Sequence, residues 1–86
     1  LNYEKVKKIA ICESNFKQEA RGKAGEVGIF QWLPSSFKIY ASKYQEPELN
    51  IYSAKDNIYL GVKVMADGGW SNCVCFKKQG INKYKL

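Results

Sequence analysis

An acidic residue stands among apolar ones near the start of the chain, in the stretch ICESNF at residues 11–16. Val6, Ile9, Ala10 and Glu13 follow the i, i+3, i+4, i+7 spacing of one helix face, which places Glu13 at the C-terminal end of an apolar stripe. Loss of hydration disfavours the charged form of a carboxyl group, so a carboxyl in such a place can hold a proton near neutrality and release it. The general acid of glycoside cleavage needs this property.

A glycine-rich segment follows at residues 20–28, ARGKAGEVG, and it breaks any periodicity, which predicts a loop or a short hairpin. Glycines let backbone approach a bulky polymer closely, and the amide of Gln31 can bond both donors and acceptors of a sugar. Trp32, Trp70 and several tyrosines offer rings on which sugars can stack. These residues suggest chemistry on a glycan, although an isolated glutamate at a helix end is most often a solvated surface residue.

Three helices are predicted to position these residues: one over about residues 3–14 with Asn2 as its N-cap, one with Pro34 in its first turn, and one over about residues 54–66 that starts in a capping-box-like pair, Ser53 and Asp56. The expected core face of the second helix is Phe37, Tyr40, Ala41 and Tyr44, and that of the third is Ile58, Val62 and Met65. No segment alternates as a long strand. The fold class expected is a small, mainly α domain with a Gly-rich loop between its first two helices.

The chain has 86 residues, enough for one small core, so we predict a single domain over residues 1–86. It carries fourteen Lys and Arg against eight acids, a net charge of +6, which attracts polyanions such as nucleic acid, anionic lipid or an anionic cell wall. A solvated, lysine-rich surface explains the charge equally well. The absence of histidine excludes His-metal sites and Ser-His or Cys-His catalysis, so any proton transfer falls to carboxylates, Tyr, Lys or Cys.

Cys12, Cys73 and Cys75 allow at most one intramolecular disulfide. Cys-x-Cys is too tight for the usual zinc spacing and a fourth ligand is missing, so no metal site is expected. A bridge from Cys12 to Cys73 or Cys75 would close a loop of about sixty residues and stabilise the fold by roughly 4 kcal/mol. The alternative is three reduced thiols in a cytosolic protein. No run is long enough to span a membrane and no signal peptide is visible. Because the chain starts at Leu1, we expect an excised domain or mature fragment.

The stretch ESNF followed by GEVGIFQWLPSSF resembles the motif pair of the lytic transglycosylases and goose-type lysozymes. Their pattern is Glu-Ser, then Gly-x-x-Gly-x-x-Gln, then Pro-x-Ser/Thr, and a third pattern is Asn-Ile-x-x-Gly. The matching positions here are Glu13, Ser14, Gly25, Gly28, Gln31, Pro34, Ser36, Asn57, Ile58 and Gly61. The stretch ICES with a later GGWSNCVC is also similar to the resuscitation-promoting-factor branch of lysozyme-like domains. The resemblance spans about residues 6 to 76.

The resemblance implies that peptidoglycan glycan strands are the substrate, cut at the β-1,4 bond between N-acetylmuramic acid and N-acetylglucosamine. Glu13 would protonate the leaving oxygen and then deprotonate the muramoyl 6-hydroxyl, which closes a 1,6-anhydro ring without water or a cofactor. The implied substrate-binding residues are Ser14, Gly25, Glu26, Gly28, Gln31 and Asn57. Asn57 with Gly61 would support the cleft from the third helix, and Ser14 would orient Glu13 or bond the substrate.

Two features depart from the family pattern. The C-terminal Tyr-Asn-Ala-Gly motif of many transglycosylases is absent, so the tyrosine that contacts the catalytic glutamate has no matched counterpart. Four tyrosines are candidates to replace it: Tyr40, Tyr44, Tyr52 and Tyr59. Glu26 stands where many transglycosylases carry alanine, and it could activate water in an inverting lysozyme if the two carboxyl groups lie about 6.5–9.5 Å apart. An exposed loop acid is the slightly favoured interpretation of Glu26.

Under this resemblance Cys12 pairs with the C-terminal cysteines, with Cys75 preferred over Cys73, and the bridge pins the first helix and Glu13. A disulfide implies an oxidising, extracytoplasmic location, where the net charge attracts the domain to an anionic wall. A monomer suffices. Two other functions stay open: a glycan-binding module without turnover, and a basic nucleic-acid binder. The sequence offers no groove-reading motif, so no nucleic-acid partner is expected.

Overall fold

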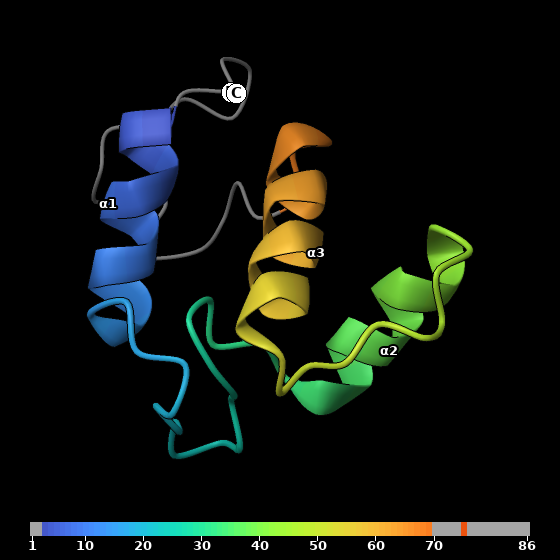
Figure 1. Cartoon of the computed structure of the whole chain (residues 1–86), viewed down its shortest axis with the longest axis horizontal. Coiled ribbons are helices and arrows are strands. Elements are labelled where there is room, and N and C mark those ends of the chain that lie inside the picture. Colours follow the sequence, from blue (N-terminus) through green and yellow to red (C-terminus); the bar gives the residue numbers. More distant parts are fainter. Residues whose placement is uncertain (1–2, 70–74, 76–86) are drawn as a thin grey trace.

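The computed structural model describes residues 3–69 and residue 75 of the chain. Three helices follow one another in this part: α1 Tyr3–Ser14, α2 Pro34–Lys43 and α3 Ala54–Ala66. In Figure 1, α1 and α3 run in opposite directions, and the loop between α1 and α2 lies at the end of α1 where that helix stops. Within the described residues the β structure consists of two isolated bridges, so the prediction of a small, mainly α fold is confirmed. None of the described helices is long and apolar enough to cross a membrane.

The first helix ends in a left-handed turn at the residues that follow Glu13 and Ser14. Asn15 donates its backbone N–H to the carbonyl of Ile11 at 2.8 Å, and Phe16 donates to the carbonyl of Ala10 at 3.3 Å. Both residues have positive φ, 55° at Asn15 and 65° at Phe16. These bonds satisfy carbonyls that the last turn of a helix otherwise leaves without partners. The predicted range of α1 is confirmed, and the predicted N-cap Asn2 lies outside the described residues.

The starts of α2 and α3 are also those predicted from the sequence. Pro34 occupies the first turn of α2, where its missing N–H costs no hydrogen bond. Ser53 caps α3 by accepting a bond from the N–H of Asp56 at 3.3 Å. The Asp56 carboxylate does not return a bond to Ser53, as it would in a full capping box, but accepts from the N–H of Asn50 at 2.9 Å. The acid therefore fixes the turn before α3 as well as the helix.

The core lies between the three helices and the loop, and its largest fully buried apolar side chains are Ile9, Trp32, Leu60, Val64 and Met65. On α2 the predicted face is confirmed, since Phe37 and Ala41 are buried and Tyr40 and Tyr44 pack against the core.

On α3 the predicted residues also face the core, since Met65 is buried and Ile58 and Val62 are partly buried and pack against it. The buried face of α3 further contains Asn57 and Gly61. A Cβ on Gly61 would lie 2.4 Å from Cδ2 of Phe30, so only glycine lets that ring reach the helix. A search for apolar spacing misses these two positions because they are not apolar.

Tyr44, just after α2, donates a hydrogen bond to the carboxylate of Asp67, just after α3. This bond, with burial and the negative charge of Asp67, raises the pKa of Tyr44 from 10.0 to about 12. Because the pKa is raised in the folded state, the contact stabilises the fold fully below about pH 10, and the contribution is lost as the pH rises through about 12. An ultraviolet titration should show a late-titrating phenolate that Tyr44→Phe removes. Equal curves for the two proteins would contradict this assignment.

Candidate active site

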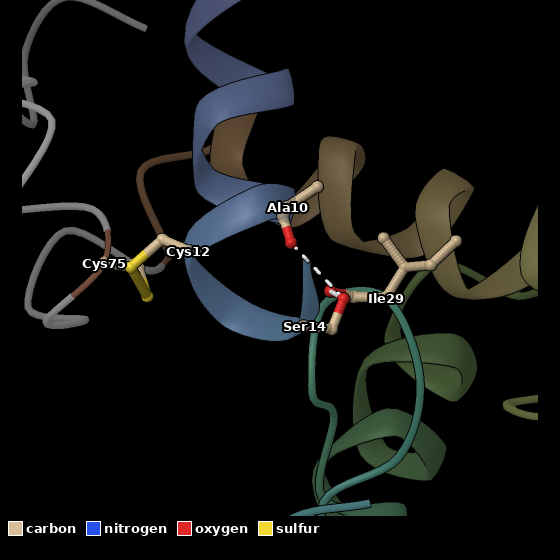
Figure 2. The surroundings of a disulfide bond; sticks show 5 residues. All are labelled: Ala10, Cys12, Ser14, Ile29 and Cys75. Carbon is tan, nitrogen blue, oxygen red and sulfur yellow. Dashed lines mark hydrogen bonds between the residues drawn. A yellow bond between two sulfur atoms is a disulfide. The ribbon is translucent and has the colours of Figure 1, made fainter. Parts of the chain in front are cut away.

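Glu13 lies in the last turn of α1, and both of its neighbours in sequence tie that turn to other parts of the molecule. Cys12 forms a disulfide with Cys75, and the Cα atoms are 5.7 Å apart. The hydroxyl of Ser14 donates a hydrogen bond to the carbonyl of Ile29 at 2.7 Å. The carbonyl of Ala10, one turn earlier in α1, is a second and more distant acceptor at 3.3 Å. Figure 2 shows Cys12 and Ser14 pointing to opposite sides of α1. The helix end that carries the half-buried Glu13 is therefore held from two sides.

The disulfide answers the question that the sequence left open. Cys75, the preferred partner, is bonded to Cys12, while Cys73 lies outside the described residues. Among residues 3–69 and 75 no group of His, Cys, Asp or Glu side chains could hold a metal ion.

The Gly-rich loop is built around Val27, which forms antiparallel bridges with Arg21 on one side and Trp32 on the other. Val27 and Trp32 exchange backbone bonds of 2.8 and 3.0 Å, and Gly22 donates its N–H to the carbonyl of Glu26 at 2.9 Å. Two positions of the family motif need the left-handed region, Gly25 with φ 91° and Gly28 with φ 82°. A side chain at either position would strain the turn, which explains glycine there.

Gln31 also has a positive φ, 52°, and its amide is used to hold the loop. Nε2 donates to the carbonyls of Gly28 at 2.8 Å and Ala20 at 3.2 Å. The amide oxygen of Gln31 faces Gly22. A Cβ added to Gly22 would lie 2.9 Å from that oxygen and 2.2 Å from Oε1 of Glu26. The structure thus brings Gln31 and Glu26 together over Gly22.

The Glu26 side chain is half-buried, and its Oε1 accepts a bond from the N–H of Ala24 at 2.9 Å. The carboxylate thereby closes the tip of the loop, rather than extending freely into solvent as expected for an exposed loop acid.

Asn57 is fully buried and holds the loop from α3. Its Oδ1 accepts from the N–H of Phe30 at 3.0 Å, and its Nδ2 donates to the carbonyls of Val27 at 3.0 Å and Ile51 at 3.1 Å. A residue with no exposed side chain does not touch a glycan from this position. This buried position agrees with the expectation that Asn57 supports the cleft from the third helix.

Gln18 performs a similar task and was not found in the sequence analysis. Its Oε1 accepts from the N–H of Ile29 and its Nε2 donates to the carbonyl of Ile51, both at 3.1 Å. A Cβ on Gly28 would lie 2.6 Å from Oε1 of Gln18 and 2.4 Å from Nδ2 of Asn57, so glycine is needed where the two amides meet. No local signal distinguishes Gln18 from a solvated surface glutamine, because its partners are remote in sequence.

Replacing Asn57 with leucine should lower the free energy of unfolding by about 3 kcal/mol. The change removes the Asn57 acceptor of the buried N–H of Phe30. It also removes the Asn57 donor to the carbonyls of Val27 and Ile51, which still accept bonds from the Trp32 N–H and from Gln18 Nε2. Urea unfolding followed by circular dichroism measures the loss. Asn50→Leu, at an exposed position in the preceding turn, is the comparison. A loss for Asn57→Leu no larger than that for Asn50→Leu would contradict the supporting role.

The aromatic residues proposed for glycan contact divide between surface and core. Trp32 is 2% exposed and donates from Nε1 to the carbonyl of Asn57 at 3.2 Å, so the structure contradicts a stacking role for it. Trp70 lies outside the described residues. The hydroxyl of Tyr44 is bonded to Asp67 and that of Tyr59 to Glu46 at 2.6 Å. Of the four tyrosines considered for contact with Glu13, these two therefore donate their hydroxyl hydrogens to other carboxylates.

A family model described as the transglycosylase SLT domain matches residues 1–68. These residues include α1, the Gly-rich loop, α2 and α3, and therefore the Glu-Ser, Gly-x-x-Gly-x-x-Gln, Pro-x-Ser and Asn-Ile-x-x-Gly motifs. The stretch GGWSNCVC lies at the end of the match and beyond it. No curated protein and no solved structure matches the chain.

Proposed function

Because the chain belongs to the transglycosylase SLT domain family, whose members act on peptidoglycan, we propose that it cleaves peptidoglycan glycan strands with Glu13 as its acid and base. The observation that supports this proposal most directly is the bond from Ser14 to Ile29. It ties the end of α1 to the loop that carries Gly25, Gly28 and Gln31. An acid can serve in catalysis only if its helix holds it in a constant place against the substrate-binding backbone.

In the proposed reaction Glu13 gives its proton to the glycosidic oxygen that leaves. The N-acetyl group of the substrate stabilises the positive charge that develops on the sugar ring. The carboxylate of Glu13 then takes the proton of the muramoyl 6-hydroxyl, whose oxygen bonds to the anomeric carbon and closes the 1,6-anhydro ring. The proton balance is closed, because Glu13 ends the cycle protonated, and no cofactor takes part.

The fixed backbone of the loop supplies the remaining contacts in this proposal. Gly25 and Gly28 let a glycan approach closely, and the amide oxygen of Gln31 is the acceptor that remains after its nitrogen is bonded. The disulfide supports an extracytoplasmic place of action, because such bonds persist in oxidising compartments.

The decisive experiment is mass spectrometry of soluble products after incubation with purified peptidoglycan. Anhydro-muropeptides would support the transglycosylase. Products heavier by one water would favour a hydrolytic muramidase, in which Glu26 is the second carboxylate. No released product, with retained binding, would overturn the enzyme and leave a glycan-binding module.

A further inference from the structure

Arg21 lies on the Gly-rich loop with its guanidinium held in one orientation. Nη1 donates to the carbonyl of Gln18 at 3.0 Å and to that of Ala20 at 2.9 Å. Its central carbon lies 5.5 Å from the centre of the Tyr52 ring, so the cation rests against an aromatic face. Exposed arginine side chains usually lose entropy when they bind a ligand, and these contacts have already removed much of that freedom.

The charge of Arg21 has no carboxylate partner in the described part of the chain, where the ion pair found joins Lys63 and Glu46. The two hydrogens of Nη1 are engaged by backbone carbonyls, which leaves the edge formed by Nε and Nη2. That edge presents two parallel N–H groups, the geometry that matches both oxygens of a carboxylate. Tyr52 is 60% exposed, so the pair faces solvent.

The position of Arg21 connects it to the proposed glycan site. Its backbone forms a bridge with Val27, between Glu26 and Gly28 of the motif. The preceding residue, Ala20, accepts the bond from Gln31 and a backbone bond from Gly28 at 3.0 Å. A strand seated against the loop therefore places its substituents near this guanidinium.

We propose that Arg21 binds a carboxylate of the peptide part of peptidoglycan, so that the site favours strands that carry peptides. The proposal rests on the proposed function. In an intact strand the lactyl carboxyl of muramic acid is joined to the peptide as a neutral amide, so the free carboxylates are those of the peptides. A fixed arginine beside the loop is suited to that anion, whereas N-acetylated sugar rings with an amide-linked lactyl group offer it only neutral oxygens.

The test compares the binding of variants to two preparations of peptidoglycan. One is intact. From the other an amidase has removed the peptides, and the lactyl carboxylates that this hydrolysis frees on muramic acid have been converted to neutral amides with methylamine and a carbodiimide. All proteins carry Glu13→Gln, so that cleavage does not disturb the measurement. Arg21→Gln should weaken binding to the intact material about tenfold or more and leave binding to the stripped material unchanged. Arg21→Lys should restore little, because an ammonium lacks the planar fork.

Lys23→Gln is the matched control, since it removes the same charge two residues further along the exposed tip of the loop. It should change binding to both preparations slightly and equally. Tyr52→Leu keeps the charge and removes the ring, and it should weaken binding to the intact material only. Thermal unfolding of each variant verifies that the loop still folds.

Equal losses on the two preparations would overturn the proposal, as would full binding by Arg21→Lys. A loss that disappears when hydrofluoric acid removes phosphate polymers from peptide-bearing walls would assign Arg21 to phosphate and overturn it too. The failure of the proposed function is separate: a protein with Glu13 intact would then release nothing from either preparation. Cleavage of both preparations with no effect of Arg21→Gln would reject this inference alone.

Discussion

Glu13→Gln should lower the rate of muropeptide release by a factor of about 10²–10⁴ while leaving binding to peptidoglycan within a factor of two or so. Glutamine has the shape of the acid but no proton to give to the leaving oxygen and no carboxylate to take one back. The helix end is held by the Cys12 disulfide and by the Ser14 hydroxyl, and neither contact involves the Glu13 side chain, so the fold should persist. Release is measured by chromatography of soluble products and binding by cosedimentation.

Two further acids are the controls for this experiment. Glu19→Gln changes an exposed carboxylate six residues along the chain and should have no effect on the rate. Glu26→Gln separates the mechanisms: a transglycosylase should retain most of its activity, whereas an inverting hydrolase should lose as much as with Glu13→Gln. Activity of Glu13→Gln within tenfold of the original protein would reject Glu13 as the acid.

Replacing Cys12 and Cys75 by serine together should lower the free energy of unfolding by about 4 kcal/mol. The bond joins residues 63 positions apart, so it removes a large share of the freedom of the unfolded chain. A protein of this size has a small core and little stability to spare. We expect activity to fall as well, because Cys12 directly precedes Glu13 and its bond is one of the two attachments of that turn. Guanidinium unfolding gives the stability.

The matched control is Cys73→Ser, which removes the third thiol and keeps the bond between Cys12 and Cys75. Its stability under oxidising conditions should equal that of the original protein, and a reductant should destabilise both to the level of the double variant. A Cys73→Ser protein that behaves like the double variant would show that Cys73 is the true partner of Cys12.

The sequence by itself determined the helices, because their signals are local. Pro34 and Ser53 mark two helix starts, and apolar spacing with a following break marks α1, so the predicted bounds agree with the structure. The order of the motifs was also enough to predict the family. Such features depend only on residues a few positions apart, so they can be read from the sequence without the fold.

Only the tertiary structure decided which side chains support the loop and which remain at the surface. Asn57 and Gln18 hold backbone groups that lie 11 to 33 residues away, and no local pattern indicates such partners. Trp32 is suited to a sugar by type, yet burial against the core takes it away from the surface. Arg21 is one of many basic residues in the sequence. Its orientation arises because two carbonyls and the ring of Tyr52 converge on it when the turns around α1 and α3 meet.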